Sequence, residues 1–70
     1  MKAARLRRGM VMRYVGEDHK FMTGLKVKLI APIGRGLWDV APWIESDQRF
    51  SWVTSDARRE DLILFEEEQS

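Results

Sequence analysis

Short runs of alternating apolar and polar residues, separated by turn-forming clusters, fill this 70-residue chain from about residue 9 to residue 65. In the clearest run, residues 25–29, Leu25, Val27 and Leu29 alternate with two lysines. Such period-2 alternation places one face of a strand in the core and the other in water. We therefore predict an all-β domain with strands near 10–15, 25–30, 37–44, 50–54 and 62–65. One short helical turn is expected within 55–61, before the last strand.

The predicted core combines the apolar face of residues 25–29 with residues from three later strands. Its expected members are Leu25, Val27, Leu29, Val40, Val53 and Leu62. On the first strand, Met10, Met12 and Tyr14 share one face. The chain has no cysteine, so disulfides cannot add stability. A domain of this size buries only about 60% of its unfolded surface, so at least one of Trp38, Trp43 and Trp52 is expected to stay exposed.

The charges are unevenly distributed, although the net charge is only +1. Residues 1–35 carry nine Lys and Arg against two acids, and residues 36–70 carry three Arg against nine acids. The two halves could neutralise each other across paired strands, or the basic half could form a functional face. We predict three segments: a flexible basic arm over 1–8, the folded domain over 9–65, and an acidic tail over 66–70.

No apolar run approaches the roughly 20 residues that span a bilayer. The basic N-terminus lacks a following apolar segment and does not read as a secretory signal. We therefore expect a cytoplasmic protein with no membrane partner.

Several segments together resemble the SH3-like small β-barrels. They are the glycine-bounded loop 16–24, the strand Lys26-Val27-Lys28-Leu29, the segment Trp38-Asp39-Val40, and Val53 followed by a polar turn and Leu62. The resemblance covers about residues 9–65 and implies a five-stranded barrel. It places Tyr14 and Trp38 near the surface where eukaryotic SH3 domains bind proline-rich peptides. The chain lacks the Tyr-rich loop start and the Pro-x-Asn-Tyr segment of those domains, so polyproline recognition is not expected.

Aromatic residues are the first candidates for a contact site. Pro42 removes a backbone donor and weakens local pairing, and Trp43 follows it near a strand end. Counting from Trp38 and Val40 places Trp43 on the outer face. We therefore predict a partner-binding or self-association surface of Trp43, Ile44 and Leu37, to which the resemblance adds Tyr14. The set Tyr14, Trp38, Trp43, Phe50 and Trp52 could also form an aromatic cage, although most of these rings are expected in the core, where the register admits either Phe50 and Trp52 or Val53.

The favoured function is a non-enzymatic protein-binding module, or an accessory subunit of a larger bacterial or phage assembly. A nucleic-acid-binding barrel is the alternative, with Arg5, Arg7, Arg8, Lys26, Lys28 and Arg35 as its cations. A regulatory subunit of an enzyme is a third possibility. His19, the sole histidine, sits in a polar loop. No catalytic residue, cofactor-binding residue or metal ligand is predicted.

Overall fold

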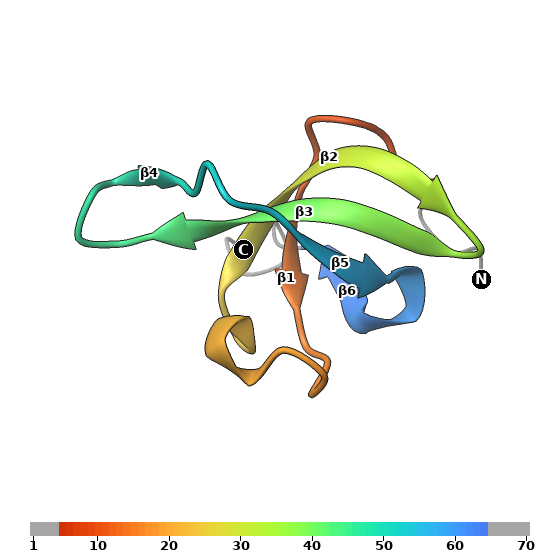
Figure 1. The fold of residues 1–70 in the computed structure, drawn as a ribbon, viewed down its shortest axis with the longest axis horizontal. Helices are drawn as coiled ribbons and strands as arrows, with labels where there is room; N and C mark the ends of the chain where they lie inside the picture. Colours follow the sequence, from red (N-terminus) through yellow and green to blue (C-terminus); the bar gives the residue numbers. More distant parts are fainter. Residues whose placement is uncertain (1–4, 65–70) are drawn as a thin grey trace.

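The protein, in a computed structural model that describes residues 5–64, is built around one antiparallel sheet (Figure 1). The sheet order is β4-β3-β2-β1-β6, and β5 pairs with β3 beside this path. Two 3₁₀ turns, η1 and η2, interrupt the strands. In chain order the elements are β1 (Val11–Tyr14), η1 (Lys20–Met22), β2 (Lys26–Gly34), β3 (Leu37–Ile44), β4 (Arg49–Phe50), β5 (Ser55–Arg58), η2 (Arg59–Asp61) and β6 (Leu62–Leu64).

The first strand lies between β2 and β6 because its alternation supplies a strongly apolar face. Met12 pairs in register with Val27 on one side and with Leu64 on the other. Met12 and Tyr14 are buried, whereas Arg13 between them points to the opposite face. The predicted face of Met10, Met12 and Tyr14 is confirmed, since Met10 also packs against the core.

The core lies on one side of the sheet. It contains Met12, Tyr14, Met22, Val27, Leu29, Val40, Ala57 and Leu62, with Leu6, Met10, Trp38 and Leu64 packed against it. Leu6 falls inside the segment predicted as an arm. Met22 comes from η1, so the first long loop contributes a fully buried side chain to the core.

The third strand has partners on both edges. β2 covers one edge, while β4 and β5 divide the other between them. The β3–β4 hairpin extends beyond the body of the molecule, as Figure 1 shows. Within the described residues no pairing joins β5 to β6, so the sheet does not close through strand pairing.

Several sequence predictions require correction. Within residues 5–64 six strands replace five, because residues 51–54 of the expected strand 50–54 form a bulge, and the chain pairs with β3 on either side of it as β4 and β5. Val53 is 75% exposed rather than buried, because that bulge carries it away from the core. Leu25 is also exposed, because β2 begins only at Lys26 and Leu25 still belongs to the turn. Its N–H donates to the carbonyl of Met22, whose side chain fills the core at this end.

The predicted short helical turn before the last strand is present, but it takes up only the second part of residues 55–61. Residues 55–58 are extended and pair with β3, and only residues 59–61 form a 3₁₀ turn. Charged residues obscured this strand in the sequence, yet Ala57 is buried opposite Trp38. Residues 1–4, Phe65 and the acidic tail 66–70 lie outside the described residues.

Candidate partner-binding surface

A two-residue insertion between β4 and β5 creates the most exposed apolar feature of the described chain. Trp43 pairs with Phe50 and Val40 pairs with Ser55, so two residues of β3 face four residues of the returning strand. We refer to residues 51–54 as the Trp52 bulge. Within it, the Trp52 side chain is 85% exposed, and Val53 is almost as open. Bulges redirect side chains in this way because the extra residues have no partner in the ladder.

Pro42 provides the local cause of the Trp52 bulge. The N–H of Ser51 donates to the carbonyl of Pro42 at 2.8 Å. In a regular antiparallel pair the opposite residue returns a second bond, but proline has no N–H. Regular pairing ends at this point, and the Ser51 hydroxyl accepts the N–H of Val53 at 3.0 Å. The predicted lapse of pairing near Pro42 is found only on this edge of β3, since Pro42 stays in register with Val27 on the other edge and pairing with β4 resumes at Trp43.

Trp43 is fixed by its neighbours on the β3–β4 hairpin. Its ring meets Phe50 edge to face with 5.0 Å between centroids, and Lys26 Nζ lies 4.3 Å from the indole centroid. The indole N–H donates to Oε1 of Glu45 at 3.0 Å. Gln48 Nε2 donates to the other Glu45 carboxylate oxygen at 2.9 Å. The indole ring and its N–H thus take part in internal contacts, and Trp43 is only partly exposed.

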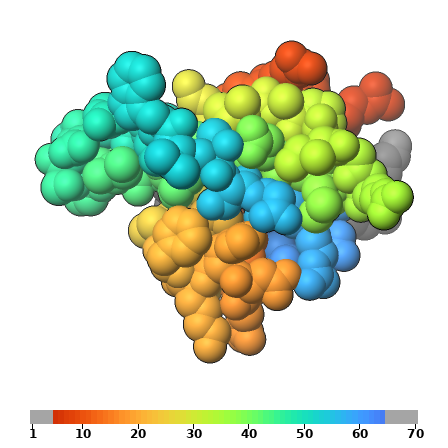
Figure 2. All heavy atoms as spheres, in the orientation of Figure 1, coloured from red at the N-terminus to blue at the C-terminus, as the bar shows by residue number. Residues whose placement is uncertain are grey.

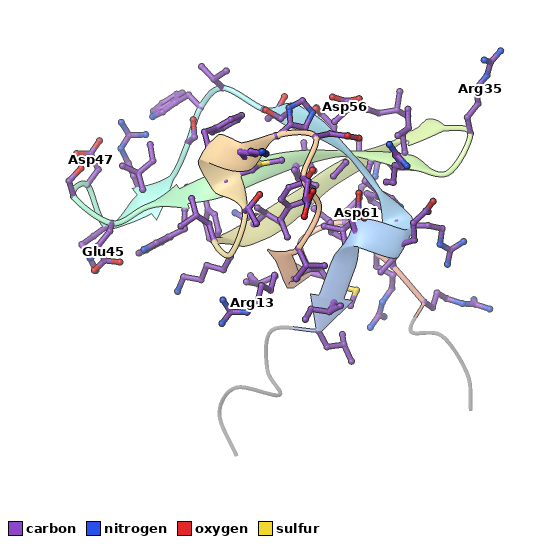
Figure 3. The ribbon with its side chains drawn as sticks, turned by 90° about the horizontal axis from the view of Figure 1, so that it is seen from below. Arg13, Arg35, Glu45, Asp47, Asp56 and Asp61 are labelled. Carbon is purple, nitrogen blue, oxygen red and sulfur yellow. The ribbon has the colours of Figure 1, made fainter. Side chains whose placement is uncertain are left out.

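A cationic side chain lies near each of three aromatic rings, those of Trp43, Phe50 and Trp52. Lys26 lies over Trp43, Lys28 Nζ lies 5.2 Å from the Phe50 centroid, and Arg49 Cζ lies 5.6 Å from the Trp52 centroid. All three distances fall within the range of cation–π attraction. Arg49 also contacts Asp47 at 3.3 Å, across the hairpin turn whose acids are labelled in Figure 3.

The first long loop is attached to β5 by two side-chain pairs. His19 Nε2 lies 3.0 Å from Oδ1 of Asp56, and Arg58 donates to Asp18 at 2.6 Å. The hydrogen bond with Asp18 raises the pKa of the Arg58 guanidinium. Beyond His19, the ring of Phe21 projects from η1 and is exposed. In Figure 2 the orange loop and the blue-green segment that follows β4 lie on the same face of the molecule.

The predicted contact residues are not brought together. Leu37 and Ile44 stand at opposite ends of β3, roughly 23 Å apart at the rise of an extended strand. Tyr14 is 1% exposed, with its hydroxyl accepting the N–H of His19, so its ring is a core element. Trp43 does lie on the outer face with Lys26, as its parity predicts. Trp52, the most exposed aromatic residue among residues 5–64, was absent from the predicted contact set.

The predicted nucleic-acid cations are also divided. Arg5, Arg7 and Arg8 are exposed and precede β1, while Lys26 and Lys28 project from β2 and are partly buried. Arg35 stands at the tip of the β2–β3 turn, far from the acids of the β3–β4 turn (Figure 3).

Within residues 5–64, no helical segment is long and apolar enough to cross a bilayer. No three His, Asp or Glu side chains in this range lie close enough together to hold a metal ion.

No protein-family model, curated protein or solved structure matches the chain.

Proposed function

We propose that this protein is a non-enzymatic binding module of the SH3-like type, which docks a protein partner on the Trp52 bulge. The observation that carries the proposal is the exposure of Trp52, whose ring is 85% open next to an equally prominent Val53. Trp residues dominate binding energy at protein interfaces because a large ring is desolvated on contact. The bulge is held by the Ser51–Pro42 backbone bond and by the Ser51 hydroxyl, so it presents that ring without a large ordering cost on binding.

The SH3-like assignment is supported by the strand connections. β1 pairs with both β2 and β6, and a 3₁₀ turn directly precedes β6. This is the order that the sequence resemblance implies, with the fourth strand of the barrel divided into β4 and β5. Function does not follow from such a fold, so the partner-binding proposal depends on the surface alone.

The test begins with affinity capture by the wild-type protein, followed by direct binding measurements with each purified candidate. Replacing Trp52 by Ala should weaken binding of a true partner by about 30-fold or more, as for interface hot spots. Phe21→Ala is the matched control, because Phe21 is also an exposed aromatic but belongs to η1. A partner that binds the folded Trp52→Ala protein as tightly as wild type would refute the proposed surface.

Nucleic-acid binding remains the second candidate, and one observation favours it. Each of Trp43, Phe50 and Trp52 has a cation within cation–π distance, and sites for single strands combine rings with cations. If this function holds, affinity should fall with salt by roughly one log unit of slope per phosphate contacted. Replacing Lys28 and Arg49 by Gln should flatten that slope. Absence of binding to single- or double-stranded DNA and RNA at about 50 mM salt would exclude it.

A further inference from the structure

We infer that the partner segment at the Trp52 bulge binds as an extended strand, by pairing its backbone with that of Phe50 on the outer edge of β4. This inference rests on the proposed function and specifies how the partner is held. The occupant is a protein segment able to adopt β structure, with one large apolar residue placed against the Trp52 ring. Proline does not fit at the position that donates to Phe50, because proline has no N–H.

The outer edge of β4 is open to an added strand. β4 is the terminal strand in the order β4-β3-β2-β1-β6, and within the part of the chain that the structure describes no strand pairs with its outer side. It belongs to the hairpin that extends beyond the body of the molecule (Figure 1). Such an edge is a template for a further strand, because its outward backbone groups have no ladder partner.

The direction of the Phe50 backbone groups follows from one hydrogen bond. The N–H of Ser51 donates to the carbonyl of Pro42, and the next pair along the ladder is Trp43 with Phe50. Hydrogen-bonded and non-hydrogen-bonded pairs alternate in an antiparallel ladder. The Trp43–Phe50 pair is therefore non-hydrogen-bonded, and the N–H and carbonyl of Phe50 both point away from β3. That carbonyl accepts a long bond of 3.4 Å from Nη1 of Arg49, which leaves room for a better-placed amide donor.

The exposed indole stands next to this backbone pair. Trp52 follows Phe50 by two residues, and it is 85% exposed. A strand paired at Phe50 passes the indole ring close to the bonded pair, so a large apolar side chain there can cover the ring. The backbone bonds fix the position of the segment, and the ring supplies apolar burial. A helix could also cover Trp52, but its backbone groups are bonded internally and cannot pair with Phe50.

A second copy of this chain fits the same edge less well. If two β4 strands paired about a two-fold axis at Phe50, the indole of Trp52 in each copy would lie opposite Gln48 in the other. The side-chain amide of Gln48 is already bonded to Glu45, so the indole would meet a polar turn. β4 is also only two residues long and carries Arg49, and short charged edges disfavour self-pairing. A segment with its own apolar residue at this position is the better occupant.

The first test measures amide hydrogen exchange by NMR. Peptides are selected from a random displayed library on the full-length protein, and the best peptide whose binding is lost in Trp52→Ala is synthesised. In the saturated complex the N–H of Phe50 should exchange more slowly than in the free protein, by about tenfold or more, because it gains an acceptor. Ser51 is the internal control, since its N–H is already bonded to Pro42 and should change less.

The second test modifies the peptide backbone. Each peptide position in turn carries an N-methyl group, which removes one donor. Because only alternate residues of a strand bond to a given neighbour, methylation of the donor to Phe50 should weaken binding by about tenfold or more. Methylation of either adjacent residue should change binding by about threefold or less. Phe21→Ala is the matched protein variant and should bind every peptide as wild type does.

The outcomes separate this inference from the proposed function. A peptide that needs Trp52 but leaves exchange at Phe50 unchanged overturns the inference and leaves the docking surface intact. If no selected peptide depends on Trp52, both fail for protein segments. Protection of Phe50 that appears without peptide and rises with protein concentration makes a second copy the occupant and the inference wrong.

A parallel titration uses an oligothymidylate of about 12 nucleotides, which is within the usual site size for one small barrel. If that strand binds more tightly than every selected peptide and its binding needs Trp52, the occupant is nucleic acid and the inference is wrong. Weaker binding of the oligothymidylate than of the peptides supports a protein segment.

Discussion

The indole N–H of Trp43 donates a 3.0 Å hydrogen bond to Oε1 of Glu45, its neighbour two residues along the hairpin. The same ring is enclosed by Phe50 and by the ammonium group of Lys26. Trp52, nine residues later, projects from its bulge into solvent. The two tryptophans therefore differ in environment: Trp43 is fixed by contacts within the β3–β4 hairpin, and Trp52 is exposed.

This difference predicts that the two tryptophans contribute unequally to stability. Trp43→Ala should lower the free energy of unfolding by about 2 kcal/mol, less than for a fully buried Trp because the ring is partly exposed. Trp52→Ala should change it by about 0.5 kcal/mol or less, as expected at an exposed site. Urea denaturation of the two variants measures both values. Equal destabilisation by the two substitutions would show that the Trp52 ring is packed in solution.

A second prediction compares two valines that differ only in position. Val27 is fully buried between β1 and β3, whereas Val53 lies on the bulge. Val27→Ala should cost about 1–3 kcal/mol through lost burial and a residual cavity. For a domain of this size, each kcal/mol lowers the melting temperature by roughly 4–8 °C. Val53→Ala serves as the control and should melt within a few degrees of wild type. If the Val27 variant melts like wild type, the β1–β2–β3 register is incorrect.

Gly16 gives a prediction based on close approach. A Cβ placed on Gly16 would stand 2.5 Å from Oδ2 of Asp61 and 2.6 Å from the Tyr14 hydroxyl. The adjacent N–H of Val15 donates to the carbonyl of Asp61 at 2.8 Å, so the loop cannot easily move away from η2. Gly16→Ala should therefore cost about 1–3 kcal/mol, the usual range for overpacking. Ser46→Ala, in the exposed hairpin turn, is the control. Wild-type stability in both variants would contradict this contact.

Much of the fold was predictable because alternation in the sequence matches the burial of two strands. Met12, Tyr14, Val27 and Leu29 are all buried as their patterns predict. Burial was predicted wrongly where a side chain's place in the sequence pattern differs from its place in the folded core. The alternation over 25–29 placed Leu25 in the core, but β2 begins only at Lys26 and Leu25 is exposed. Met22 is buried instead, although it belongs to a loop whose sequence is mostly polar.

The candidate site was harder to predict because a two-residue insertion changes which way side chains point. Alternation through 50–54 leaves Trp52 and Val53 on opposite faces, yet both are exposed. Pro42 was the available signal, since its missing donor faces the strand that returns through Ser51. The missing donor of Pro42 produces the bulge in the returning strand, at residues 51–54. The sequence analysis considered the effect of Pro42 only on Trp43, in the same strand, and so did not predict the exposure of Trp52.

The last prediction concerns the turn between β2 and β3. Gly34 pairs with Leu37, and the two residues between them, Arg35 and Gly36, both have positive φ values, 56° and 75°. This is the backbone of a two-residue type I′ turn, in which the first position favours Asn, Asp or Gly over Arg. Arg35→Asn should therefore raise the free energy of unfolding by about 0.5–1 kcal/mol, because Asn tolerates the left-handed conformation better.

Equilibrium urea denaturation with Arg35→Lys as the matched control measures this gain. Lysine keeps the charge and is no better suited to a positive φ, so it should leave stability unchanged, within about 0.5 kcal/mol. A gain shared by both variants would point to the guanidinium rather than to the backbone.

The same pair of variants tests the nucleic-acid alternative. A phosphate contact at Arg35 would make binding weaker in Arg35→Asn, while Arg35→Lys would retain most of it. Unchanged binding in the stabilised variant would remove Arg35 from that set of cations.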